Sequence, residues 1–104
     1  MEQITPQELK VRMDRKDPLV LLDVRQGWEL QLSRLPGATH IPIEEIEFRT
    51  GELNPEDEII VFCHQGIRSA AVAEHLRRLG FKAVNLAGGL DAWARTVDPT
   101  MTRY

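Results

Sequence analysis

Two uninterrupted apolar runs constrain the fold of this chain more than any other feature of its sequence. Leu19–Leu22 and Ile59–Phe62 each have the length of a β-strand, and each leads into a polar segment. Strands that are apolar on both faces are typical of parallel sheets that are covered on both sides. A third strand is predicted at 83–86, and a short edge strand, which tolerates Pro42, at 40–43.

Helical segments alternate with these strands. A capping box at 5–8, with a proline in the first turn, predicts a helix that ends before the Asp17–Pro18 pair. Apolar residues recur at helical spacing in 69–79, where Leu79 closes the apolar stripe. The other helical segments are predicted at 26–35, 44–48 and 90–95. This alternation predicts an α/β fold with a mostly parallel central sheet flanked by helices.

Length and composition narrow the class of protein. The 104 residues suit a single domain over 1–104, in which about 97–104 form a C-terminal tail. The 13 basic and 16 acidic residues give a net charge of −3, which does not favour a nucleic-acid partner. One cysteine excludes an internal disulfide, and no apolar run approaches the roughly 20 residues of a membrane helix. Because Met1–Lys10 lacks the apolar core of a signal peptide, we expect a cytoplasmic location and no membrane partner.

The strongest candidate for chemistry is Cys63, which ends the second apolar strand. In open α/β sheets, ligands gather at the carboxyl ends of the strands, and the N-terminus of a following helix favours anions there. Gly66 allows a tight bend whose backbone N–H groups can point inward, and Arg68 adds a positive charge. A lone cysteine at a strand end is otherwise most often a small buried hydrophobe. In this setting we interpret Cys63 as a nucleophile held as the thiolate.

Four motifs, taken together, resemble those of the rhodanese-like sulfurtransferases in their single-domain form. The resemblance covers nearly the whole chain and implies a three-layer rhodanese-like domain. The motifs are Leu22-Asp23-Val24-Arg25 with Trp28-Glu29, then Leu35-Pro36-Gly37-Ala38 with Ile41-Pro42, then Cys63 to Ser69, and finally Asn85 to Trp93 with the Gly88-Gly89 pair.

The resemblance implies a mechanism. Cys63 would take the outer sulfur of a donor such as thiosulfate, release sulfite and become a persulfide. A thiol, cyanide or a protein acceptor would then remove that sulfur, with no metal and no organic cofactor. The loop that holds the persulfide or the anionic donor would consist of His64, Gln65, Gly66, Ile67, Arg68 and Ser69. His64 could also orient donors or acceptors.

Two departures from the family pattern bear on this interpretation. The loop carries fewer cations than in members that use thiosulfate efficiently, so the natural donor could be another persulfide. Ser33-Arg34 replaces the common Gly-His, and we interpret this as a surface variation.

Three residues outside the loop are candidates for its support. Asp23 and Arg25 follow the first apolar strand, so they either support the cysteine loop or form an ion pair between loops, and we favour the ion pair. Trp28 could line the mouth of the site, whereas Trp93 is expected in the core. His40, His64 and His75 lack the spacing of metal ligands, so no metal site is predicted.

Two other functions remain as alternatives. The first is a protein-partnered sulfur relay or binding module with little thiosulfate activity. The second is a cysteine-dependent phosphatase or arsenate reductase. Related proteins of that second kind use a C-x5-R loop, which is one residue longer and fits a tetrahedral oxyanion. The C-x4-R loop from Cys63 to Arg68 fits a single sulfur atom better and makes this alternative distant.

Overall fold

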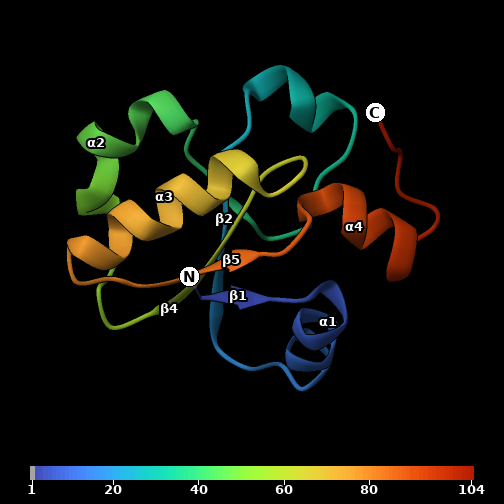
Figure 1. The fold of residues 1–104 in the computed structure, drawn as a ribbon, viewed down its shortest axis with the longest axis horizontal. Coiled ribbons are helices and arrows are strands. Elements are labelled where there is room, and N and C mark those ends of the chain that lie inside the picture. The colour runs from blue at the N-terminus through green and yellow to red at the C-terminus, as the bar shows by residue number, and fades with distance from the viewer. Residues whose placement is uncertain (1) are drawn as a thin grey trace.

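The computed structural model describes residues 2–104, which form a five-stranded parallel sheet between two layers of helices (Figure 1). The strand order is β1-β5-β4-β2-β3. The strands are β1 (Gln3–Ile4), β2 (Leu19–Asp23), β3 (Thr39–His40), β4 (Glu58–Phe62) and β5 (Lys82–Leu86). The α-helices are α1 (Pro6–Asp14), α2 (Ile46–Arg49), α3 (Ile67–Arg78) and α4 (Gly89–Thr96), and the 3₁₀ helices are η1 (Gly27–Gln31), η2 (Ile43–Glu45) and η3 (Thr50–Glu52).

The two predicted apolar strands are neighbours at the centre of the sheet. β2 pairs with β4 along five residues, from Leu19 opposite Glu58 to Asp23 opposite Phe62. Ile59 and Val61 belong to the core on the α3 face, and Ile60 and Phe62 belong to the core on the α1 and α4 face. Burial on both faces explains why the sequence shows continuous apolar runs rather than alternation. The predicted α/β class and the mostly parallel sheet are confirmed.

Local signals placed the long helices well. The predicted capping box at the start of α1 is formed, because the Glu8 N–H donates to Thr5 Oγ1 at 3.1 Å and the Thr5 N–H donates to the Glu8 carboxylate at 2.9 Å. Trp93 of α4 lies in the core, as expected. No helix within residues 2–104 has both the length and the apolar character needed to cross a bilayer.

One strand was missed and two local expectations were wrong. β1 was not predicted, because two residues are too short for a pattern; it is held by pairing with β5. The edge strand spans 39–40 rather than 40–43, because the Ile43 N–H bonds to the Val24 carbonyl oxygen beyond the end of β2 and the chain turns into η2 at Ile43. Leu79 is 54% exposed at the end of α3, because the helix ends at Arg78 and the chain turns there through Gly80, whose φ is +96°.

Candidate active site

Cys63 lies directly beyond the end of β4, buried at the carboxyl edge of the sheet. The backbone N–H of Gly66 donates to Cys63 Sγ at 3.2 Å, and the N–H of Ser69 lies 3.4 Å from the same sulfur. Ser69 Oγ is 3.2 Å away. Two backbone N–H groups therefore face the sulfur at the N-terminus of α3, an arrangement that stabilises negative charge.

Two glycines shape this loop. Gly66 has a φ of +90°, a left-handed conformation that L residues rarely adopt, and it is the N-cap residue of α3. Gly89 packs so closely that a Cβ there would lie 2.6 Å from the carbonyl oxygens of Cys63 and His64. These oxygens accept hydrogen bonds from the N–H groups of Leu90 and Asp91, both at 2.9 Å. In a trans peptide the C=O and N–H groups point in opposite directions. The N–H groups of His64 and Gln65, which share peptides with these two carbonyls, therefore face away from α4.

Asn85, on β5, fixes the inner side of the loop. Its side-chain nitrogen donates to the Gly66 carbonyl oxygen at 3.2 Å, and its Oδ1 accepts from Ser69 Oγ at 2.6 Å. Because the Ser69 hydroxyl donates its proton to Asn85, its oxygen is the acceptor of the hydrogen bond with Cys63 when Cys63 is a thiol. Asn85 belongs to one of the family motifs but was not predicted as a site residue. The signal that could have identified it is a polar residue within a predicted buried strand.

Arg68, in the first turn of α3, is paired with Glu29 of η1 rather than free. Two nearly parallel bonds join the guanidinium to the carboxylate, Nη1 to Oε1 at 2.6 Å and Nη2 to Oε2 at 2.9 Å. The Glu29 side chain is only 3% exposed, while that of Arg68 is 33% exposed. Burial acts to raise the pKa of Glu29, but hydrogen bonds from Arg68, the Tyr104 hydroxyl and the Gln26 N–H outweigh it and lower the pKa to about 2. The cation expected to receive a donor thus already has a partner.

Asp23 and Arg25 form a second ion pair at the same edge of the sheet. Arg25 is fully buried, and its Nη2 lies 2.8 Å from Asp23 Oδ2. The same guanidinium donates to the carbonyl oxygen and hydroxyl of Ser33, at 2.7 and 3.3 Å. The interpretation of Ser33-Arg34 as a surface variation therefore fails for Ser33, which fixes a buried arginine; Arg34 is exposed.

The remaining predicted site residues lie in the loop or beside it. Gln65 and Ile67 are exposed, and His64 is half-buried. The His64 ring nitrogen Nε2 is buried without a hydrogen-bond partner in the described part of the chain. Trp28 is 63% exposed on η1, and its ring is edge-on to Tyr104 with the centroids 6.3 Å apart. Glu29 and Tyr104 were missed because their contacts join segments 39 to 75 residues apart.

A metal site finds no support in this arrangement. Within residues 2–104, no three His, Cys, Asp or Glu side chains are grouped as a metal ion would require.

Comparisons with known proteins agree on one family. The model of the rhodanese-like domain matches residues 5–96. The chain is 39% identical over 92 residues to the Bacillus subtilis protein named "Putative sulfur carrier protein YrkF", covering 88% of this chain and 50% of that protein. It is 32% identical over 99 residues to the Bacillus subtilis "Putative sulfurtransferase YtwF", covering 95% and 96%. The chain thus spans half the length of the first relative and nearly all of the second.

A solved structure supports the same conclusion. The crystal structure of a rhodanese-like domain protein from Staphylococcus aureus superposes with a TM-score of 0.87 at 33% identity, covering 100% of this chain and 99% of that one.

Proposed function

Because the chain belongs to the rhodanese-like family of sulfurtransferases and sulfur carriers, as its motifs predicted, we propose that it moves sulfane sulfur through a persulfide on Cys63. The observation that carries the proposal is the cradle around Cys63 Sγ. The N–H groups of Gly66 and Ser69 lie 3.2 and 3.4 Å from the sulfur. Donors fixed in advance around a developing negative charge lower the cost of forming it.

The proposed reaction has two steps, formation of the Cys63 persulfide and transfer of its outer sulfur to an acceptor. The Cys63 thiolate attacks the outer sulfur of a donor such as thiosulfate. A new S–S bond forms, the sulfur–sulfur bond of thiosulfate breaks, and its electron pair leaves with sulfite. The Cys63 persulfide anion then gives its outer sulfur to a nucleophile. Cyanide becomes thiocyanate, or a thiol becomes a persulfide, and the Cys63 thiolate or thiol returns.

The thiosulfate step meets an obstacle in the site. The loop from Cys63 to Ser69 has Arg68 as its one arginine or lysine, and Glu29 holds its guanidinium with two bonds. An anionic donor must therefore compete with a buried carboxylate. This favours a second candidate function, a sulfur relay that receives sulfur from a protein or small-molecule persulfide and uses thiosulfate only slowly. Exposed Ile67 and Trp28 suit contact with such a partner.

Intact mass spectrometry tests the proposal. The purified protein is incubated with thiosulfate, with inorganic polysulfide or with a persulfidated protein, and is then weighed without reduction. We expect a gain of one sulfur atom in the wild type and none in Cys63→Ser. A gain that persists in Cys63→Ser would refute the assignment of the nucleophile.

The choice of donor separates the two candidates. Rapid gain from polysulfide or the protein persulfide, with slow gain from thiosulfate, supports the relay. Efficient turnover of thiosulfate and cyanide supports the thiosulfate sulfurtransferase. His75→Ala serves as the matched control, because His75 lies on α3 away from the loop.

A further inference from the structure

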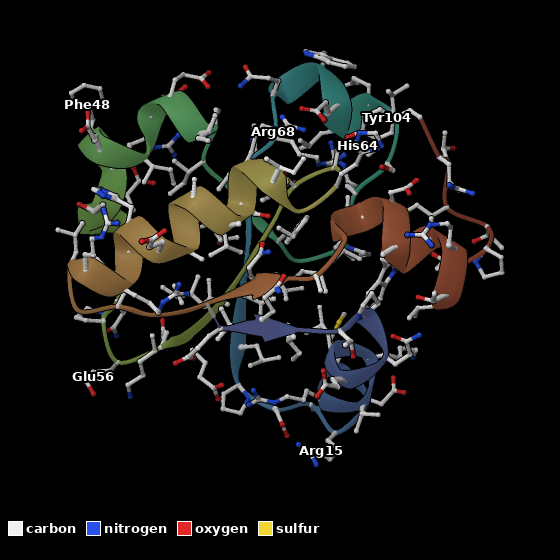
Figure 2. The ribbon with its side chains drawn as sticks, viewed as in Figure 1. Arg15, Phe48, Glu56, His64, Arg68 and Tyr104 are labelled. Carbon is white, nitrogen blue, oxygen red and sulfur yellow. The ribbon has the colours of Figure 1, made fainter. Side chains whose placement is uncertain are left out.

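Tyr104 lies against the cysteine loop although it is 40 residues further along the chain than His64. Its ring is stacked on the His64 imidazole, with the ring centroids 3.8 Å apart and the planes 8° from parallel. Figure 2 shows the two labelled side chains next to one another between η1 and α4, with Arg68 on the first turn of α3. The residue that follows Cys63 is thus covered by an aromatic ring.

The Tyr104 hydroxyl joins the two ion pairs of the site. It donates to Glu29 Oε2 and accepts from Arg25 Nη1, which lies 3.0 Å away. Glu29 is the partner of Arg68, and Arg25 is the partner of Asp23. A single hydroxyl therefore connects the half-exposed pair beside the cysteine loop to the fully buried pair behind it. Burial and the bond to Glu29 raise the pKa of Tyr104 to about 12.

The segment that carries Tyr104 is fixed along its length. The N–H groups of Val97 and Asp98 both donate to the Trp93 carbonyl oxygen, at 2.8 and 3.0 Å. Met101 packs against the core on the α1 and α4 face. Arg103 Nε then donates to Asp91 of α4 at 3.0 Å. In Figure 1 this segment leaves α4 and ends beside η1 (Gly27–Gln31), so the fold itself brings Tyr104 to the site.

We propose that Tyr104 is a positioning residue that sets which donors the Cys63 site accepts. The inference rests on the proposed function and deepens it. The ring restricts access along the His64 side of the loop, and the hydroxyl holds Glu29 against Arg68. A neutral reactant has only to pass the ring. An anionic reactant has also to draw Arg68 away from Glu29, and Tyr104 makes that exchange harder.

Charge-assisted hydrogen bonds are the strong ones, which is why the hydroxyl matters. Glu29 accepts four hydrogen bonds, two from Arg68 and one each from the Gln26 N–H and Tyr104. Without the hydroxyl, Glu29 loses one of them and can move more freely. Arg25 keeps its bonds to Asp23 and Ser33, so the buried pair persists. The effect should therefore fall on Arg68 and the loop.

Alkylation of Cys63 tests this without any sulfur transfer. Native protein is treated with iodoacetamide, which is neutral, or iodoacetate, which is anionic, and the two rates are measured by mass spectrometry. The same Cys63 thiolate attacks the CH2 carbon of both reagents and displaces iodide, so the ratio of the two rates reports how the site favours or disfavours a negatively charged reactant. Tyr104→Phe keeps the ring and removes the hydroxyl. Tyr104→Ala removes both.

The two variants should behave differently. We expect Tyr104→Phe to raise the iodoacetate-to-iodoacetamide rate ratio by about three- to tenfold, less than the full effect of one charge-assisted bond, because Glu29 keeps its other three hydrogen bonds. We expect Tyr104→Ala to raise that ratio as well and also to raise both absolute rates. Thr102→Ala, at an exposed position in the same segment, is the matched control and should leave both rates unchanged. Circular dichroism establishes whether each variant is folded. If Tyr104→Ala does not fold, the rate ratio of Tyr104→Phe decides the question alone.

Wild-type rates for both reagents in Tyr104→Phe and Tyr104→Ala would overturn the inference. An increase in both rates with an unchanged ratio would overturn the effect on Arg68. These failures are distinct from failure of the proposed function, which would appear as no sulfur gain on Cys63 from any donor.

Titration gives an independent signature. Tyr104 is the single tyrosine of the chain, so tyrosinate absorbance reports this residue alone. A docked hydroxyl should ionise well above the ordinary pKa of 10.0, toward about 12. Ionisation near 10.0 while the protein is still folded would show that Tyr104 does not dock.

Discussion

The two ion pairs at the carboxyl edge of the sheet each join an arginine to a carboxylate, but they differ in how far the arginine is buried. Arg25 and Asp23 are 0% and 2% exposed, whereas Arg68 is 33% exposed beside a Glu29 that is 3% exposed. Arg25 also donates to backbone and side-chain oxygens of η1 and the segment after it. Among residues 2–104, the side-chain hydrogen bonds of Arg68 go to Glu29 alone. Arg25 is therefore held in place by several buried bonds, while Arg68 can exchange its partner for a ligand.

This contrast suggests a division of labour. A buried and fully bonded pair contributes to the position of neighbouring segments, and breaking it leaves an uncompensated charge. A pair with one exposed member can open at a smaller cost, because water replaces part of what is lost. Tyr104 contacts both pairs, so it couples the rigid pair to the exchangeable one.

The largest expected effect comes from breaking the buried pair. Asp23→Ala leaves the Arg25 guanidinium buried without its carboxylate and should lower the free energy of unfolding by about 3–5 kcal/mol. Urea denaturation measures this. Glu74→Ala, which removes an exposed pair with Arg78 on α3, is the control and should change stability by less than about 0.5 kcal/mol. A loss below about 1 kcal/mol for Asp23→Ala would show that the buried pair does not hold these segments in place.

An intermediate effect is expected from Arg68. Arg68→Ala removes the cation and leaves the Glu29 carboxylate near the loop, so anionic reactants should suffer more than neutral ones. We expect the iodoacetate-to-iodoacetamide rate ratio at Cys63 to fall about tenfold, which corresponds to about 1.4 kcal/mol. Arg78→Ala, far along α3, should leave the ratio unchanged. Equal losses for both reagents would assign Arg68 a structural role only.

A third effect concerns the pH dependence of stability. The pKa of Glu29 is lowered from 4.5 to about 2, so its carboxylate stabilises the folded state above pH 4.5. That contribution is lost as the pH falls from 4.5 toward 2, because the unfolded chain then binds the proton first. Urea midpoints at pH 7, 4.5 and 3 should therefore decline more steeply in the wild type than in Glu29→Gln. Parallel declines would show that the carboxylate is not held by Arg68 and Tyr104 in solution.

Much of the fold was predictable because it depends on local signals. Continuous apolar runs identified β2 and β4, and a capping box identified the start of α1. The order Cys63, Gly66, Arg68 after a buried strand identified the loop, because these residues are neighbours in the chain. β1 and the exposure of Leu79 escaped prediction, since a two-residue strand exists only by pairing with β5 and a helix end depends on the turn that follows.

The sequence by itself determined the α/β class, the family and the place of the lone cysteine, since each follows from residues close together in the chain. Only the tertiary structure decided how that cysteine is surrounded. The pairing of Arg68 with Glu29, the anchoring of Ser69 by Asn85 and the stacking of Tyr104 on His64 join residues that are 16 to 40 positions apart. Such contacts leave no periodic pattern, because they depend on where separate elements end in space.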